Sequence, residues 1–185
     1  MKYLIVYFLI AFFFFSCSNQ SKINKIFNCD AIKIKNPESI LDFNKNFRLT
    51  APSDWKTELY FDKYQSEIFV ADTTKQLTES FILIASFKLG NLNFDTDFHN
   101  RINSILQKEN LQIINSGNES FQSKPTYWYV TKGAKNGFTH HQFNIIVKLS
   151  ENSYFKGYSE IYGANNIEDR ICESITILEK IEFLQ

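Results

Sequence analysis

Residues 126–149 read TYWYVTKGAKNGFTHHQFNIIVKL, and most of the predicted architecture depends on them. Side chains of opposite polarity alternate along this stretch, which is typical of strands that show different faces to core and solvent. Asn136-Gly137 supplies the positive φ angles that a tight hairpin turn needs. The stretch therefore predicts two antiparallel strands, at 126–132 and 139–149.

Neighbouring segments extend this hairpin into an antiparallel meander. Its four predicted strands lie at 112–121, 126–132, 139–149 and 154–162. Upstream, alternating residues at 32–35 and 47–50 predict two half-buried strands. The segment 81–85 is apolar on both faces, which is expected of an interior strand covered on each side.

Two segments have the period of amphipathic helices. The first begins near Asp95, a residue type that caps helix N-termini, and ends at Asn110, whereas the second follows Asn165-Asn166. The predicted stripes contain Phe94, Phe98, Ile102, Ile105 and Leu106 in the first helix, and Ile167, Ile171, Ile175 and Leu178 in the second. A twisted antiparallel meander covered by two helices is an α+β fold.

The first sixteen residues have the anatomy of a secretory signal peptide. Lys2 precedes thirteen uninterrupted apolar residues, and the chain becomes polar at Ser18. Thirteen helical residues rise only about 20 Å, which is short of the hydrocarbon core that a permanent span must cross. We therefore expect residues 1–16 to be removed.

The end of this leader resembles the bacterial lipobox, in which an apolar run closes on a small residue and a cysteine. Ser16 and Cys17 match that pattern. The resemblance implies that Cys17 carries acyl chains and anchors the protein in the membrane. Ser18 then favours the outer membrane, facing the periplasm. The alternative is cleavage by an ordinary signal peptidase, which would release a soluble protein.

Behind the anchor we expect a mobile polar tether at 17–27 and a single domain at 28–185. Cys29 and Cys172 remain as a pair in a compartment where disulfides persist. A bridge between them is permitted but not demanded, because two separate buried thiols are common in protein cores. A redox role is disfavoured because the chain has no Cys-x-x-Cys motif.

A resemblance to the PsbP and Mog-type domains spans about residues 45–183. NFRLTAPSDW at 46–55 is similar to their opening strand, where a proline leads to a tryptophan, and ICESI at 171–175 is similar to their closing helix. The resemblance implies a sandwich of sheet and helices used as an accessory or binding module, in photosystem assembly, in binding a small GTPase and in many bacterial lipoproteins. It implies no shared catalytic residues.

Catalytic and metal-binding patterns are not evident in the sequence. His140 and His141 are adjacent on a predicted strand, so their side chains leave opposite faces and cannot grip one metal. His99 is predicted to lie on the first helix near Asp95, within reach of a weak pair only. No Gly-rich phosphate loop or nucleophile motif stands out, and we expect no cofactor and no enzymatic activity.

Charge and aromatic content suggest the kind of partner. Basic and acidic residues number 20 each, so the surface does not favour nucleic acid. Rows of tyrosine on predicted strands are candidates for a contact surface, formed by Tyr127, Tyr129, Tyr154, Tyr158 and Tyr162. Cross-strand aromatic pairing within the sheet is the alternative.

The function hypothesis is therefore a non-catalytic, lipid-anchored module that binds another protein of the envelope. Two alternatives stay open. One is a carrier for a small apolar ligand or lipid, with a pocket between sheet and helix, and the other is an enzyme whose residues the spacing does not reveal.

Overall fold

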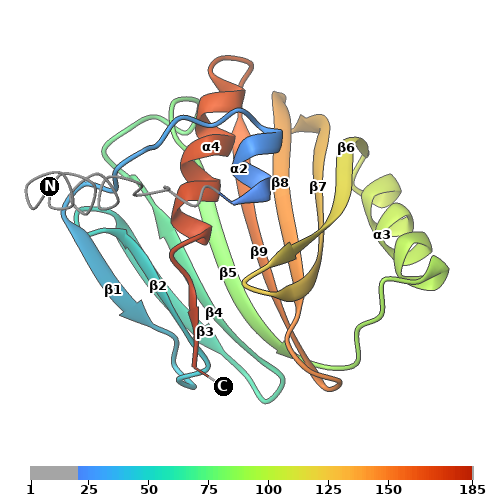
Figure 1. Ribbon diagram of the computed structural model, residues 1–185. Helices are drawn as coiled ribbons and strands as arrows, with labels where there is room; N and C mark the ends of the chain where they lie inside the picture. Colours follow the sequence, from blue (N-terminus) through green and yellow to red (C-terminus); the bar gives the residue numbers. More distant parts are fainter. Residues whose placement is uncertain (1–20, 185) are drawn as a thin grey trace, which may run out of the picture.

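The computed structural model describes residues 21–184 and shows two antiparallel sheets with three helices (Figure 1). The larger sheet has seven strands in the order β3-β4-β5-β9-β8-β7-β6. These strands are β3 (Lys56–Phe61), β4 (Gln65–Ala71), β5 (Ile82–Leu89), β6 (Leu111–Phe121), β7 (Lys124–Lys135), β8 (Phe138–Lys148) and β9 (Ser153–Tyr162). The smaller sheet has the order β1-β2-β10 and contains β1 (Pro37–Leu41), β2 (Phe47–Pro52) and β10 (Glu182–Phe183).

The predicted meander is confirmed as β6 to β9, paired in sequence order. Asn136 and Gly137 have φ angles of 54° and 82° at the β7–β8 turn, as the Asn-Gly dipeptide requires. The predicted interior strand corresponds to β5, which lies between β4 and β9. The α+β prediction is therefore confirmed, although the chain forms two sheets rather than one.

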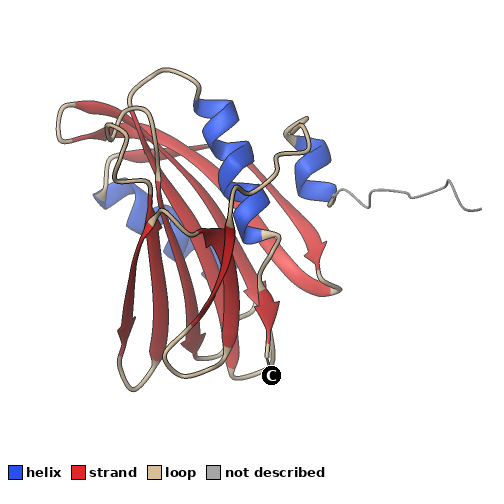
Figure 2. Cartoon of the chain, turned by 90° about the vertical axis from the view of Figure 1, so that its left-hand side faces the viewer, coloured by secondary structure: helices blue, strands red, loops and turns tan. Residues whose placement is uncertain are grey.

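The three helices lie on opposite sides of the large sheet (Figures 1 and 2). Helix α4 (Ile167–Leu178) and the short helix α2 (Lys22–Ile26) cover one face, and α3 (Thr96–Lys108) covers part of the other. The Asp95 side chain caps α3 by accepting a hydrogen bond from the Phe98 amide, as predicted. The arrangement is a helix–sheet–helix sandwich.

The main core lies between the large sheet and the layer formed by α4, α2 and β2. Phe47, Phe143 and Phe155 are fully buried there, and the Phe47 and Phe155 rings pack edge to face at 5.5 Å. Gly157 lets α4 sit directly on β9, because a Cβ at this position would lie 2.6 Å from Leu178 Cδ2. Burial of these side chains supplies most of the driving force for the fold.

Two local predictions are wrong. Residues 32–35 form no strand, and the chain pairs only from Pro37 onward. The described part of the predicted mobile tether is ordered, because α2 buries Ile23 in the main core and Ser21 caps the helix. Short polar helices of this kind depend on tertiary packing, which the local sequence does not report.

Cys29 and Cys172 form a disulfide between the segment after α2 and the middle of α4. The structure thus selects the bridged alternative over two separate buried thiols. The bond joins residues 143 positions apart in the sequence and fixes the N-terminal segment to the main body of the domain.

Candidate functional site

The predicted tyrosine surface is mostly covered. Tyr127 and Tyr129 are 5% and 3% exposed because α3 packs over them, and Tyr162 is buried against the His140 ring at 4.7 Å. Tyr154 and Tyr158 are half-buried. The prediction of an exposed contact surface is therefore wrong for Tyr127, Tyr129 and Tyr162, whose rings pack within the fold.

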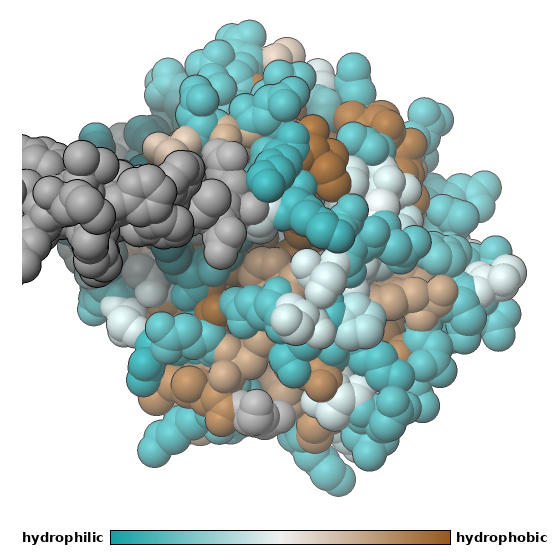
Figure 3. Space-filling view, in the orientation of Figure 1, coloured by the Kyte–Doolittle hydropathy of each residue, from teal (hydrophilic) through white to brown (hydrophobic). Residues whose placement is uncertain are grey.

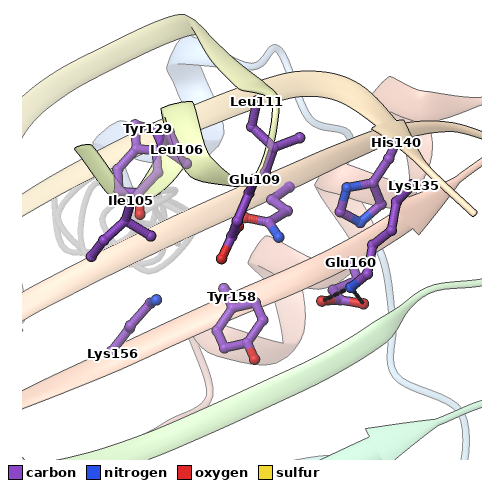
Figure 4. A pocket seen from close by; sticks show the side chains of 11 residues that line it. Ile105, Leu106, Glu109, Leu111, Tyr129, Lys135, His140, Lys156, Tyr158 and Glu160 are labelled. Carbon is purple, nitrogen blue, oxygen red and sulfur yellow. Dashed lines mark hydrogen bonds and ion pairs between the residues drawn. The ribbon is translucent and has the colours of Figure 1, made fainter. Parts of the chain in front are cut away.

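A cavity of about 370 Å³ lies where the C-terminal end of α3 meets the large sheet (Figure 4). We call it the α3 cavity. The helix and the start of β6 contribute apolar side chains and one carboxylate, from Ile105, Leu106, Glu109 and Leu111. Strands β7, β8 and β9 contribute mostly polar side chains, from Tyr129, Lys135, His140, Gln142, Lys156, Tyr158 and Glu160.

Cross-strand register brings the cavity's polar side chains together. Tyr129 on β7 lies opposite Asn144 on β8, and Asn144 lies opposite Tyr158 on β9. Because alternate residues of a strand share a face, His140 and Gln142 lie on this same side of β8. The sequence predicted this face correctly but did not show that α3 ends above it.

Burial sets the protonation of the cavity's groups. Burial raises the pKa of Tyr158 to about 12, with the nearby Glu160 and Glu67 carboxylates adding to the effect. Burial also raises the pKa of Tyr129 and lowers that of His140. At neutral pH both phenols therefore carry their protons and can donate hydrogen bonds, and the imidazole is neutral.

Two lysines of the cavity differ in their surroundings. Lys135 Nζ lies 2.9 Å from Glu160 Oε1, so this pair is close to neutral as a unit. Lys156 Nζ lies 4.7 Å from the centre of the Tyr158 ring, a cation–π contact. Burial lowers the pKa of Lys156, and the neighbouring Lys88 ammonium adds to that effect.

Within residues 21–184 the histidines form no metal centre. No group of three or more His, Cys, Asp or Glu side chains in that range could hold an ion. His140 and His141 point to opposite faces of β8, as predicted, and both are buried. Neither ring nitrogen of His140 has a hydrogen-bond partner among the described residues.

A second feature is a group of exposed aromatic side chains beside β3, which sequence reasoning missed. We call it the aromatic edge. It consists of Phe43, Phe61 and Tyr64, each more than half exposed, with relative exposures of 54% to 62%. Tyr60 is also exposed but lies on the opposite face of β3 from Phe61, against Phe69. Strand β3 ends the order of the large sheet, so one side of it pairs with no described strand. Hydrophobic side chains are visible at the lower left of the surface, where the β1–β2 and β3–β4 turns lie (Figure 3).

Buried Asp42 links the two turns that carry the aromatic edge. Its carboxylate accepts hydrogen bonds from the Phe47 amide at 2.8 Å and from the Ser66 hydroxyl. Ser66 lies opposite Phe61 in the β3–β4 hairpin, so Asp42 joins this hairpin to the β1–β2 turn. The neighbouring Phe43 ring stacks on Phe61 at 3.6 Å between ring centres and 2° between planes.

The space between the large sheet and α4, where an apolar carrier would hold its ligand, is occupied by packed side chains. Phe47, Phe143, Phe155 and Trp128 fill it together with aliphatic residues of α4. This packing argues against an apolar ligand between the large sheet and α4. It does not bear on the other face of the sheet, where the α3 cavity lies.

The predicted signal peptide and lipid-attachment residue Cys17 lie outside the described residues. Among residues 21–184, none of the helices has the length and apolar character needed to traverse a bilayer.

Comparison with known proteins shows the fold class. Cyanobacterial PsbP from Synechocystis sp. PCC 6803 is similar at 10% identity, with a TM-score of 0.57 over 84% of this chain and 96% of that one. The Ran-binding protein Mog1p of Saccharomyces cerevisiae is similar at 6% identity, with a TM-score of 0.52 over 82% and 97%. A Bacteroides thetaiotaomicron protein is similar at 10% identity, with a TM-score of 0.52 over 83% of this chain and 50% of that one.

The chain therefore has the PsbP/Mog-type α+β sandwich fold, as the resemblance implied. No family model matches the sequence, and no curated protein matches it.

Proposed function

We propose that this protein is a non-catalytic binding module, anchored by lipid on Cys17 in the outer membrane, facing the periplasm, and that it docks another envelope protein. The leader and the residues around Cys17 support the anchor. The Cys29–Cys172 disulfide supports the compartment, because structural disulfides persist outside the reducing cytoplasm.

The aromatic edge is the observation that carries the binding proposal. Exposed aromatic groups of this kind are enriched in protein interfaces, and a free edge strand offers backbone groups to a partner. Phe43 and Phe61 expose 54% each although they stack on one another. Asp42 and Ser66 hold the two turns together, so the surface is rigid before a partner arrives.

The fold also agrees with a binding role. Mog1p, which shares this fold, is a Ran-binding protein, and its likeness to the present chain is one of architecture.

Site-specific photocrosslinking in intact cells tests this proposal. A photoreactive phenylalanine analogue replaces Tyr64 in the aromatic edge, and the same analogue replaces exposed Gln107 on α3 as the matched control. We expect a discrete protein adduct from position 64 that is absent from position 107. The adduct should weaken when Phe43→Ser is added. Absence of an adduct at position 64, or an equal adduct at both positions, would contradict the proposal.

A further inference from the structure

The floor of the α3 cavity contains buried polar atoms that lack partners. His140 is 1% exposed and neither of its ring nitrogens has a hydrogen-bond partner among residues 21–184. Asn144, also 1% exposed, does not line the cavity itself but lies in register between Tyr129 and Tyr158, which do, and its Nδ2 has no hydrogen-bond partner among residues 21–184. An unpaired buried polar group destabilises the empty cavity, so a polar ligand that supplies hydrogen-bond partners is favoured there.

Two opposite charges border the same cavity without pairing. Lys156 reaches in from β9 and Glu109 from the end of α3, and their side chains converge beside Tyr158 (Figure 4). Neither forms an ion pair within 4.0 Å with another described residue, in contrast to Lys135 and Glu160. A ligand that presents a carboxylate to Lys156 and an ammonium to Glu109 would complement both charges.

The helix side of the cavity is apolar. Ile105, Leu106 and Leu111 face the polar strands across the space, so a ligand meets aliphatic groups on one side and hydrogen-bond donors on the other. The volume of about 370 Å³ lies within the usual range for small-molecule sites.

We propose that the α3 cavity binds a small zwitterion with an apolar side chain, of the chemical class of the free apolar amino acids. Lys156, with the Tyr158 hydroxyl, receives the carboxylate; Glu109 receives the ammonium; and the apolar side chain lies against Ile105 and Leu106. This activity goes beyond the proposed function, because the cavity and the aromatic edge share no residue.

Three ligands of one shape test the proposal on the purified full chain in detergent at pH 7. L-phenylalanine carries both charges, phenethylamine carries only the ammonium, and 3-phenylpropionate carries only the carboxylate. We expect isothermal titration calorimetry to show L-phenylalanine binding at least tenfold more tightly than either analogue. Binding of an analogue as tightly as L-phenylalanine, or no binding of L-phenylalanine at millimolar concentration, would overturn the proposal.

Two charge variants assign the roles. Lys156→Met should abolish the preference for L-phenylalanine over phenethylamine, and Glu109→Gln should abolish its preference over 3-phenylpropionate. Lys132→Met, which removes an exposed ammonium from the other face of β7, should leave both preferences intact. Preferences that survive both cavity variants, or that Lys132→Met removes equally, would refute the assigned roles. Crosslinking at position 64 remains a separate readout, so failure of either proposal is distinguishable from failure of the other.

Discussion

Cys29 is bonded to Cys172 across the interface between the α2 segment and α4, with their Cα atoms 5.3 Å apart. The bond is supported by a second link between the same elements, in which Asn24 Nδ2 donates to Glu179 Oε2. Together they make the N-terminal segment part of the folded domain. If Cys17 carries lipid, only a few residues separate the bilayer from this ordered structure.

Removing the disulfide should destabilise the domain strongly. The double variant Cys29→Ser with Cys172→Ser releases a loop of 143 residues, and loss of a native disulfide from a small domain typically costs about 2–5 kcal/mol. Urea denaturation measures the change, and reductant added to the wild type should reproduce it. Equal midpoints for the reduced and oxidised wild-type protein would contradict this expectation.

Gly133→Ala should displace the end of α3. A Cβ at Gly133 would lie 2.4 Å from the Asn110 backbone oxygen and 2.7 Å from Leu111 Cδ2, so the chain entering β6 must move. We expect a loss of about 1–3 kcal/mol in the free energy of unfolding. The matched control is Gly137→Asn, because a Cβ there meets nothing within 4 Å and asparagine tolerates its positive φ. If Gly137→Asn lowered the free energy of unfolding as much as Gly133→Ala, the close approach of residue 133 to the Asn110 backbone would not be the cause of the loss.

Lys156→Met should raise the free energy of unfolding at neutral pH. It should also remove the part of its pH dependence that comes from the Lys156 ammonium. Burial lowers the pKa of Lys156, so the folded state holds this proton less tightly than the unfolded chain does. The cost of the buried charge is therefore present at neutral pH and is relieved as the pH rises through the folded pKa toward 10.5. In urea titrations, the difference between Lys156→Met and wild type should shrink from pH 7 to pH 10. A difference that grows with pH would contradict the lowered pKa.

Asp42→Ala should lower the free energy of unfolding by more than the removal of an exposed carboxylate in a turn does. The change leaves the Phe47 amide and the Ser66 hydroxyl buried without their acceptor, which we expect to cost about 2–4 kcal/mol. Asp62→Ala is the control, because Asp62 accepts amide hydrogen bonds in the exposed β3–β4 turn and its loss should cost about 1 kcal/mol or less. If urea denaturation gave equal losses of unfolding free energy for the two variants, Asp42 would not be the contact that joins the β1–β2 and β3–β4 turns.

Local patterns predicted the meander and both long helices because their signals lie within short windows of sequence. Asn136-Gly137 specifies its turn directly, and Asp95 caps α3 as its residue type suggests. Helix α2 was missed because its stability comes from the burial of Ile23 and from the disulfide, which involve residues far away in the sequence. The two-residue strand β10 depends likewise on distant β2.

The candidate sites were less predictable than the fold. Alternation placed Tyr127 and Tyr129 on one face but did not reveal that α3 would cover them. The α3 cavity combines one helix with four strands, β6 to β9, so its composition depends on how the helix ends above the sheet. The aromatic edge brings together the β1–β2 and β3–β4 turns, which the hydrogen bond between Asp42 and Ser66 joins, and no spacing rule indicates that contact.

Intact-mass spectrometry of the protein purified from membranes tests the envelope assignment most directly. We expect a chain that begins at Cys17 and carries the added mass of a diacylglycerol group and acyl chains. A chain that begins at Met1, or one with an unmodified Cys17, would contradict it.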